Sequence, residues 1–226
     1  MAGRKNFVAG EILTAADVNS FLMDQSVMVF DDSAARGSAI PTPSEGMVTY
    51  LKSDDQVTVF DGAAFKPVGG LVAVKEAVRT APVAASATPG GEFSVPDLSV
   101  THSVSDSANK LIIMAVFGQA ASTSGRAGVG MRVYEGSTLI GQGDAAGSAL
   151  RVSSNQRAGG ADNLVTLSMG THFVHTPGAG SKTYTVRAVN PNNATHTIYI
   201  NRPERDIDDL FRTRTISSLI IMEVAV

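Results

Sequence analysis

The stretch LIIMAVF (residues 111–117) decides the fold of this chain. An apolar run of this length, in a strand, predicts that both faces of the strand are buried. The stretch YTVRAV (184–189) instead alternates between apolar and polar residues, which is typical of a strand with one buried face. The two patterns together predict strands that pack in layers.

Further strand-like runs continue from residue 92 to the C-terminus. Turn-forming segments such as Pro191–Asn193 separate them at short intervals, and the chain ends in the apolar run ISSLIIMEVAV (216–226). About eight strands of this kind predict a jelly-roll-like antiparallel β-sandwich. A β-helix would need a short internal repeat, and none is visible in the sequence.

A short amphipathic helix is predicted near the N-terminus. Thr14 is a suitable cap for its first turn, and Asp17 three residues later completes a capping-box pattern. A helix of about three turns is marginal alone in water, so its apolar face must dock on something. We assign that face to attachment or oligomer contacts. Its residues are Val18, Phe21, Leu22 and Gln25.

The domain boundaries follow from composition and turn signals. The runs MVTYL (47–51) and QVTVF (56–60) predict a β-hairpin, which completes a small helix-plus-hairpin module over residues 1–68. Ala, Pro and Gly dominate residues 69–91, which predicts a linker with a candidate strand at 71–78. Residues 92–226 are the predicted sandwich, so the fold class is mainly β.

Composition excludes several classes of function. The net charge is −3 and no Lys/Arg cluster is present, so we expect no nucleic-acid binding. The absence of Cys excludes disulfides, thiolate metal sites and a Cys nucleophile. No apolar run reaches the roughly 18 residues of a membrane span, and no signal peptide is visible. We expect synthesis in a cytoplasm and no membrane insertion.

The sequence offers little for catalysis or metal binding. His172 and His175 would lie on opposite faces of a strand, which does not suit two ligands of one metal. No nucleophile elbow of the Gly-x-Ser-x-Gly type occurs, and the paired acids fall in predicted turns, where Asp is common. We therefore expect no enzyme activity, no cofactor and no metal.

The N-terminal pattern resembles a module of many tailed-bacteriophage tail-associated proteins, particularly minor tail proteins of siphoviruses. Phe65 stands where that family often has Trp. The resemblance covers about a quarter of the chain. It is carried by GEILTAADVN (10–19), QSVMVF (25–30), AR (35–36), AIPTPSEGMVTYL (39–51) and VTVFDGAAF (57–65).

The C-terminal part resembles, less strongly, the sandwich heads of phage fibres and virion decorations. This resemblance implies a homotrimer in the virion, with other virion proteins as partners and a host-surface glycan or protein as a further partner. Leu219 and Ile221 in the last strand must be buried, in their own core or between subunits, and we assign them to the same interface. The matching runs are GSKTYTVR (180–187), TIYI (197–200) and SSLIIMEV (217–224).

Three functions compete at this point. The first is a non-enzymatic tail fibre or minor tail protein, and the second is a capsid-associated head fibre or decoration protein. A polysaccharide-degrading spike is the third, although such enzymes usually have longer chains and a β-helix. Exposed loops are the predicted receptor or intersubunit contacts. Their candidate residues are Arg126, Asn155, Arg202, Arg205 and Arg212.

Overall fold

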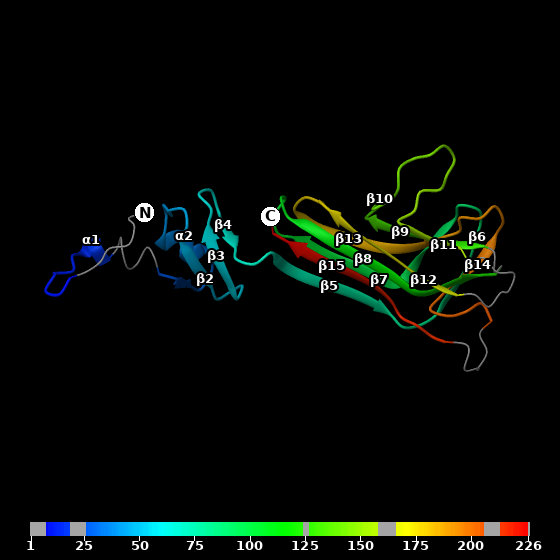
Figure 1. Ribbon diagram of the computed structural model, residues 1–226, viewed down its shortest axis with the longest axis horizontal. Helices are drawn as coiled ribbons and strands as arrows, with labels where there is room; N and C mark the ends of the chain where they lie inside the picture. The colour runs from blue at the N-terminus through cyan, green and yellow to red at the C-terminus, as the bar shows by residue number, and fades with distance from the viewer. Residues whose placement is uncertain (1–7, 19–25, 124–126, 158–165, 206–212, 226) are drawn as a thin grey trace. The chain divides into compact units, whose positions relative to one another are not determined.

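The computed structural model divides the chain into two compact units, Met1–Gly70 and Leu71–Val224. The first is a small sheet with two helices, and the second is a two-layered β structure (Figure 1). The chain is mainly β, as the sequence predicts. The structure describes residues 8–18, 26–123, 127–157, 166–205 and 213–225.

The first unit contains a four-stranded sheet in the order β1-β2-β3-β4. Strands β1 and β2 are parallel, and the other neighbours are antiparallel. The β2–β3 pair is the predicted hairpin. The elements of this unit are α1 (Ala15–Asp17), β1 (Met28–Phe30), α2 (Ser33–Ala39), β2 (Val48–Leu51), β3 (Gln56–Phe60) and β4 (Phe65–Pro67).

The predicted helix start is confirmed at α1. Thr14 Oγ1 accepts a hydrogen bond from the Asp17 amide at 3.1 Å, and the Thr14 amide donates to the Asp17 carboxylate at 3.2 Å. Both halves of the capping box are therefore formed. Val18 follows directly and is half-buried. The predicted length of the helix, with Phe21, Leu22 and Gln25, lies outside the described residues.

Helix α2 is fixed to the small sheet through Arg36. Its Nη1 donates a hydrogen bond to Thr58 Oγ1 at 3.0 Å, and its guanidinium lies 3.9 Å from the centre of the Phe65 ring. Thr58 is buried and also shares a hydrogen bond with Thr49 at 2.7 Å. Phe65 thus supplies the aromatic face for a cation–π contact.

One sheet of the second unit has six strands that occupy four positions across the sheet, because β5 and β6 share one position and β15 and β14 share another. Strands β15 and β14 pair with successive parts of β8 along one edge, and β5 and β6 lie beside them in the same succession. Strand β12 pairs with the other edge of β8. The strands are β5 (Leu71–Arg79), β6 (Val83–Ala87), β8 (Lys110–Ser122), β12 (Leu167–His175), β14 (His196–Ile200) and β15 (Ser217–Val224).

The other sheet has five strands, also in four positions. Strands β10 and β11 pair with successive parts of β9, which is followed by β13 and β7. Every pair in both sheets is antiparallel. The strands are β7 (Glu92–Val104), β9 (Gly128–Glu135), β10 (Thr138–Ile140), β11 (Ser154–Arg157) and β13 (Gly180–Val189).

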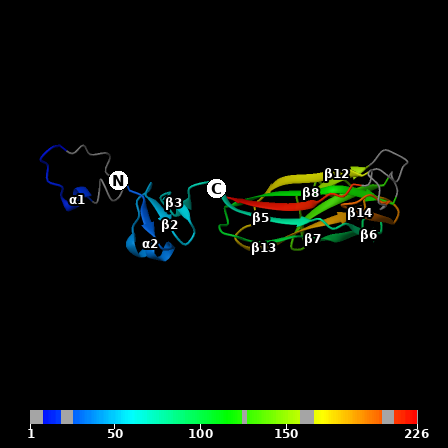
Figure 2. The same cartoon turned by 90° about the horizontal axis from the view of Figure 1, so that it is seen from below.

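The chain visits these positions in the order of a jelly roll. We number the eight positions 1 to 8 along the chain: β5/β6, β7, β8, β9, β10/β11, β12, β13 and β14/β15. In these numbers, the strand order across the first sheet is 1-8-3-6, and across the second sheet it is 2-7-4-5. Paired Greek keys produce this order. Figure 2 shows the two layers from a second direction. The predicted jelly-roll-like antiparallel sandwich is confirmed.

The hydrophobic core lies between the two layers. Strand β8 contributes Leu111, Ile113 and Phe117, and β13 of the facing sheet contributes Tyr184 and Val186. All five side chains are fully buried. Burial of each aliphatic or Phe side chain stabilises the fold by about 1.5–3 kcal/mol.

The last strand, β15, lies in the middle of its sheet, between β5 and β8. Leu219 and Ile221 are 0% and 1% exposed in the core of their own chain. Their assignment to an interface between subunits is therefore corrected in favour of the chain's own core. Strand alternation places Ile220 and Met222 on the outer face instead.

The segment predicted as a linker is folded into the second unit. Residues 71–79 and 83–87 form β5 and β6, which pair with β15 and β14. The small side chains that suggest flexibility in the sequence fit the core, where Ala87 is buried and Ala77 packs against it. The boundary between the units is at Gly70, and the candidate strand at 71–78 is confirmed.

Candidate functional site

Three of the five candidate loop residues are among the described residues. Asn155 is exposed on β11, and Arg205 is exposed in the segment that follows β14. Arg202 is half-buried, with its guanidinium 4.6 Å from the centre of the Tyr199 ring. Arg126 and Arg212 lie outside the described residues.

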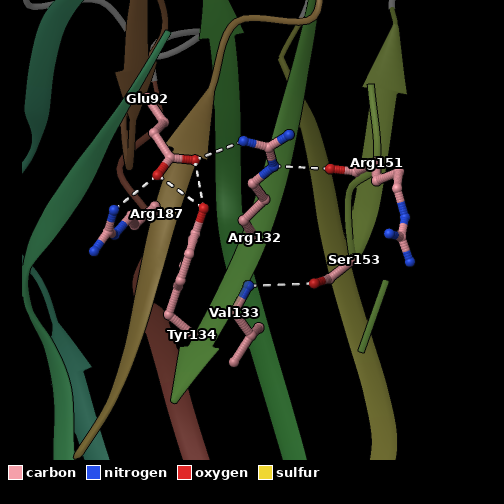
Figure 3. Close-up of polar contacts among 7 residues, drawn as sticks. All are labelled: Glu92, Arg132, Val133, Tyr134, Arg151, Ser153 and Arg187. Carbon is pink, nitrogen blue, oxygen red and sulfur yellow. Dashed lines mark hydrogen bonds and ion pairs between the residues drawn. The ribbon is translucent and has the colours of Figure 1, made fainter. Parts of the chain in front are cut away.

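A polar cluster centred on Glu92 lies on the β7-β13-β9 sheet. The Glu92 carboxylate accepts hydrogen bonds from Arg187 Nη1 at 2.7 Å and Arg132 Nη1 at 2.8 Å (Figure 3). The Tyr134 hydroxyl donates to the same carboxylate at 2.9 Å. The Arg187 guanidinium also lies 4.1 Å from the centre of the Tyr134 ring. One acid on β7 therefore binds side chains from the neighbouring strand β13 and from β9 beyond it.

The same cluster fixes the segment between β10 and β11. Arg132 Nε donates to the Arg151 carbonyl at 2.8 Å (Figure 3). Ser153 Oγ accepts a hydrogen bond from the Val133 amide and donates one to the Ile140 carbonyl, each at 3.2 Å. Through these contacts the sheet holds the strand that carries Asn155.

The chemistry of this cluster is that of a structural ion-pair network. Burial alone raises the pKa of Glu92, but hydrogen bonds from Arg132, Arg187 and Tyr134 outweigh it and lower the pKa below the ordinary carboxyl value. Burial and the bond to Glu92 raise the pKa of Tyr134. An ionised acid with both oxygens occupied suits anchoring better than proton transfer.

A second polar cluster is buried at Glu223 of β15. Its Oε2 lies 2.6 Å from His102 Nε2, and its Oε1 accepts hydrogen bonds from Asn109 Nδ2 at 2.6 Å and Ser105 Oγ at 2.7 Å. The Ser105 amide donates to Oε1 at 2.9 Å. Glu223 is 1% exposed and His102 is 6% exposed.

The Glu223 cluster ties the connection between β7 and β8 to the last strand. Burial raises the pKa of Glu223, but the bonds from Asn109, Ser105 and His102 together lower it below the ordinary value. Ser105 donates to the carboxylate rather than to His102, so the three residues do not form the relay of a serine hydrolase. This cluster, too, is an anchor.

The histidines that the sequence sets aside as metal ligands have other roles. His175 Nε2 lies 2.8 Å from Glu135 Oε2, whereas His172 is exposed on the opposite face of β12. Among the described residues, no group of three or more His, Cys, Asp or Glu side chains is placed to hold a metal ion. No helix in the described ranges is long and apolar enough to cross a membrane.

Sequence reasoning missed both clusters. Glu92 and Arg187 are 95 residues apart, and His102 and Glu223 are 121 apart. The one available signal is the position of Glu223, an isolated charge in the apolar run SSLIIMEV (217–224). Such a charge in a buried strand needs partners, but the sequence does not name them.

The outer faces of the two sheets differ in polarity. On β7 and β13 the outward residues include Ser99, Thr101 and Thr183, and the two threonine hydroxyls share a hydrogen bond at 2.9 Å. On the opposite sheet the outward residues are mostly apolar. The polar residues among them include Glu76, His172 and Ser218. The apolar ones are Val74 and Val78 of β5, Ile220 and Met222 of β15, Ile112, Met114 and Val116 of β8, and Val174 of β12.

Comparison with known proteins identifies no family for this chain. No family model matches the chain, and no curated protein matches it. A similar solved structure is that of infectious bursal disease virus Gx strain, with 10% identity and a TM-score of 0.36. The match covers 74% of this chain and 48% of that one, so the chain spans about half the length of that protein. A match this distant carries no functional conclusion.

Proposed function

We propose that this chain is a non-enzymatic structural protein of a tailed-bacteriophage virion, a homotrimeric tail fibre or minor tail protein. The first unit docks on the particle, and the sandwich faces outward. Its exposed residues, which include Asn155 on β11 and Arg205 in the segment after β14, meet a host-surface glycan or protein. The resemblance of residues 10–68 to tail-associated proteins supports the location, and the anchoring chemistry of both polar clusters supports a structural role.

The observation that carries the docking role is the exposure of large apolar side chains in the first unit. Ile12 is 84% exposed and Val8 is 69% exposed, and Val27 and Val29 follow at 57% and 56%. Large apolar side chains left exposed in this way are candidates for a surface that a partner covers. Residues 26–30 also line a cavity of about 420 Å³ together with Ala39 and Ile40.

A capsid-associated head fibre or decoration protein is the second candidate. The observation in its favour is the jelly-roll order of the sandwich, since this architecture is common in viral capsid proteins. Both candidates share the docking unit and the outward sandwich, and they differ in the position on the particle.

The docking role is tested by incorporation of variants into particles. Phage lacking the gene is complemented with the full chain, with a chain lacking residues 1–30, or with Ile12→Asp and Val29→Asp. The proposal predicts that the truncated chain keeps a folded sandwich but is absent from purified particles, and that both point variants reduce incorporation. Ser99→Asp, at an exposed position on the polar sheet of the second unit, is the control for an added charge.

Normal incorporation of the truncated chain would contradict the docking role. Cryo-electron microscopy of the complemented particles separates the two candidates. Density at the tail supports the first, and density on the capsid lattice supports the second.

A further inference from the structure

The strand β8 is apolar on both faces, but the described residues of its own chain cover only one of them. Its inward side chains are fully buried, whereas Val116 on the outer face is 38% exposed. On the neighbouring strands Val78 is 44%, Val74 is 52% and Val174 is 63% exposed. A sheet face that is exposed to water normally carries polar residues. The apolar residues of this face therefore indicate a surface that another molecule covers.

The strand register arranges these side chains in rows across the sheet. Met222 lies opposite Val74 and Ile112, and Ile112 lies opposite Val174, which gives a row of four apolar residues. Neighbouring strands bring such side chains within contact distance. The result is a continuous apolar surface that crosses all four strand positions.

The next row has charged or ionisable ends. Ile220 lies opposite Glu76 and Met114, and Met114 lies opposite His172. Glu76 is exposed on β5 at one edge of the sheet, and His172 is exposed on β12 at the other. The row therefore has an acid at one end, an imidazole at the other and apolar residues between them.

The surface has the size of a functional apolar patch. Its exposed apolar area is on the order of 400 Å², within the range of the largest patches on soluble monomers, which are often functional. With the residues around it, a sheet face of this size approaches the roughly 800 Å² per partner of a stable interface.

We propose that copies of this chain associate through the outer face of the β5-β15-β8-β12 sheet, three copies around an axis parallel to the strands. Ile220, Met222, Ile112 and Met114 then face the axis. The number of copies rests on the proposed function, and the choice of surface rests on the structure.

The width of the sheet fits three copies. Four strand positions at about 4.8 Å each give a width of about 19 Å. Three such sheets form a triangle whose centre lies about 5.5 Å from each side, close to half of the roughly 10 Å between packed sheets. Side chains from three copies would therefore fill the axis.

Charge complementarity favours a second copy as the occupant. In a ring of three sheets the β5 edge of one copy meets the β12 edge of the next, so Glu76 lies beside His172 of its neighbour. Neither side chain forms an ion pair within the described part of its own chain. A packing with β5 against β5 would instead place Glu76 against Glu76, which costs free energy.

The test is the mass of the purified full-length chain in solution, by light scattering after size exclusion. Wild-type protein is expected to be a trimer at micromolar concentration. Val174→Lys is expected to be a monomer with unchanged circular dichroism, because this position is exposed in the single chain. Ser99→Lys, an exposed edge position on the polar outer face, is the matched control and is expected to stay a trimer.

A wild-type monomer or dimer would overturn the proposal, as would a Val174→Lys trimer or a Ser99→Lys monomer. Glu76→Arg and His172→Glu provide a second check. Each alone should weaken the trimer, and the double variant should regain at least part of the loss. If the double variant loses as much trimer as the single variants, the proposed contact between the β5 edge of one copy and the β12 edge of the next is overturned. These measurements need no particle, so their failure is distinct from failure of docking on the virion.

Discussion

The two outer faces of the jelly roll differ in polarity. Each belongs to a sheet whose inner face is packed in the core, so each has a free side. On the β7-β13-β9 sheet that side carries Ser, Thr and the Glu92 network, which are stable in water. On the β5-β15-β8-β12 sheet it carries Val, Ile and Met. This difference in polarity is the reason to assign assembly to the outer face of the β5-β15-β8-β12 sheet.

The comparison also explains the two kinds of strand pattern in the sequence. Strand β13 alternates because its outer residues meet water or polar neighbours. Strand β8 does not alternate, although both strands lie in the interior of their sheets. The continuous apolar run predicts burial on two faces, and the described residues of the chain bury only one of them.

The largest expected effect is on the apolar face. Ile220→Lys places a charge at the centre of the proposed interface, and we expect association to weaken at least a hundredfold, since central interface positions contribute the most binding energy. The unfolding free energy of the single chain should change little, because a Lys stem packs along apolar surface. Sedimentation equilibrium measures the association. Thr183→Lys on the polar face is the control, and an equal loss there would break the comparison.

On the polar face the effect should be on stability instead. Glu92→Gln removes the charge that pairs with Arg132 and Arg187, and we expect a loss of about 2 kcal/mol in the unfolding free energy, since hydrogen bonds to charged groups contribute about 1.5–3 kcal/mol each and this site is partly exposed. Urea unfolding measures it, and association should be unaffected. A variant as stable as wild type would mean that the cluster anchors nothing.

The pH dependence of stability follows from the same acids. The pKa values of Glu92 and Glu223 are lowered in the folded chain, so their contribution is complete above the ordinary carboxyl pKa of about 4.5 and is lost as the pH falls through the lowered values. Urea midpoints at pH 7, 5, 4 and 3 should therefore drop below about pH 4.5. The Glu92→Gln/Glu223→Gln variant should show a flatter profile, and an unchanged slope would contradict the assignment.

The smallest effect is expected at the shared hydroxyls of Thr101 and Thr183. Thr101→Val removes one exposed hydrogen bond and should change the unfolding free energy by less than about 0.5 kcal/mol, as most surface substitutions do. The reverse experiment on the other face, Val116→Thr, should leave single-chain stability similar but weaken association. Differential scanning calorimetry and light scattering separate the two effects.

The sequence predicts the local structure of this chain well. The capping box at Thr14 and Asp17, the hairpin of β2 and β3, and the jelly-roll-like sandwich are all confirmed. These features depend on turn residues and on the period of apolar positions, which the sequence contains directly.

Features that depend on distant pairing are not predictable in the same way. The outward or inward direction of Leu219 cannot be inferred from LIIM (219–222), because every position is apolar and no period marks a face. Strand β6 resembles a linker in composition, and only its pairing with β14 shows that it is a strand. The Glu92 and Glu223 clusters join segments that meet only in the folded chain.

Site-directed crosslinking tests the central claim most directly, because the chain contains no Cys. The variant Glu76→Cys/His172→Cys places thiols at the two edges of the apolar face, and Ser99→Cys/Asn155→Cys places them at the two edges of the polar sheet. With a short bifunctional maleimide and denaturing electrophoresis, the first variant should give a ladder that ends at three chains, and the second should stay at one. Single chains for both variants, or a ladder from the polar sheet, would contradict the account.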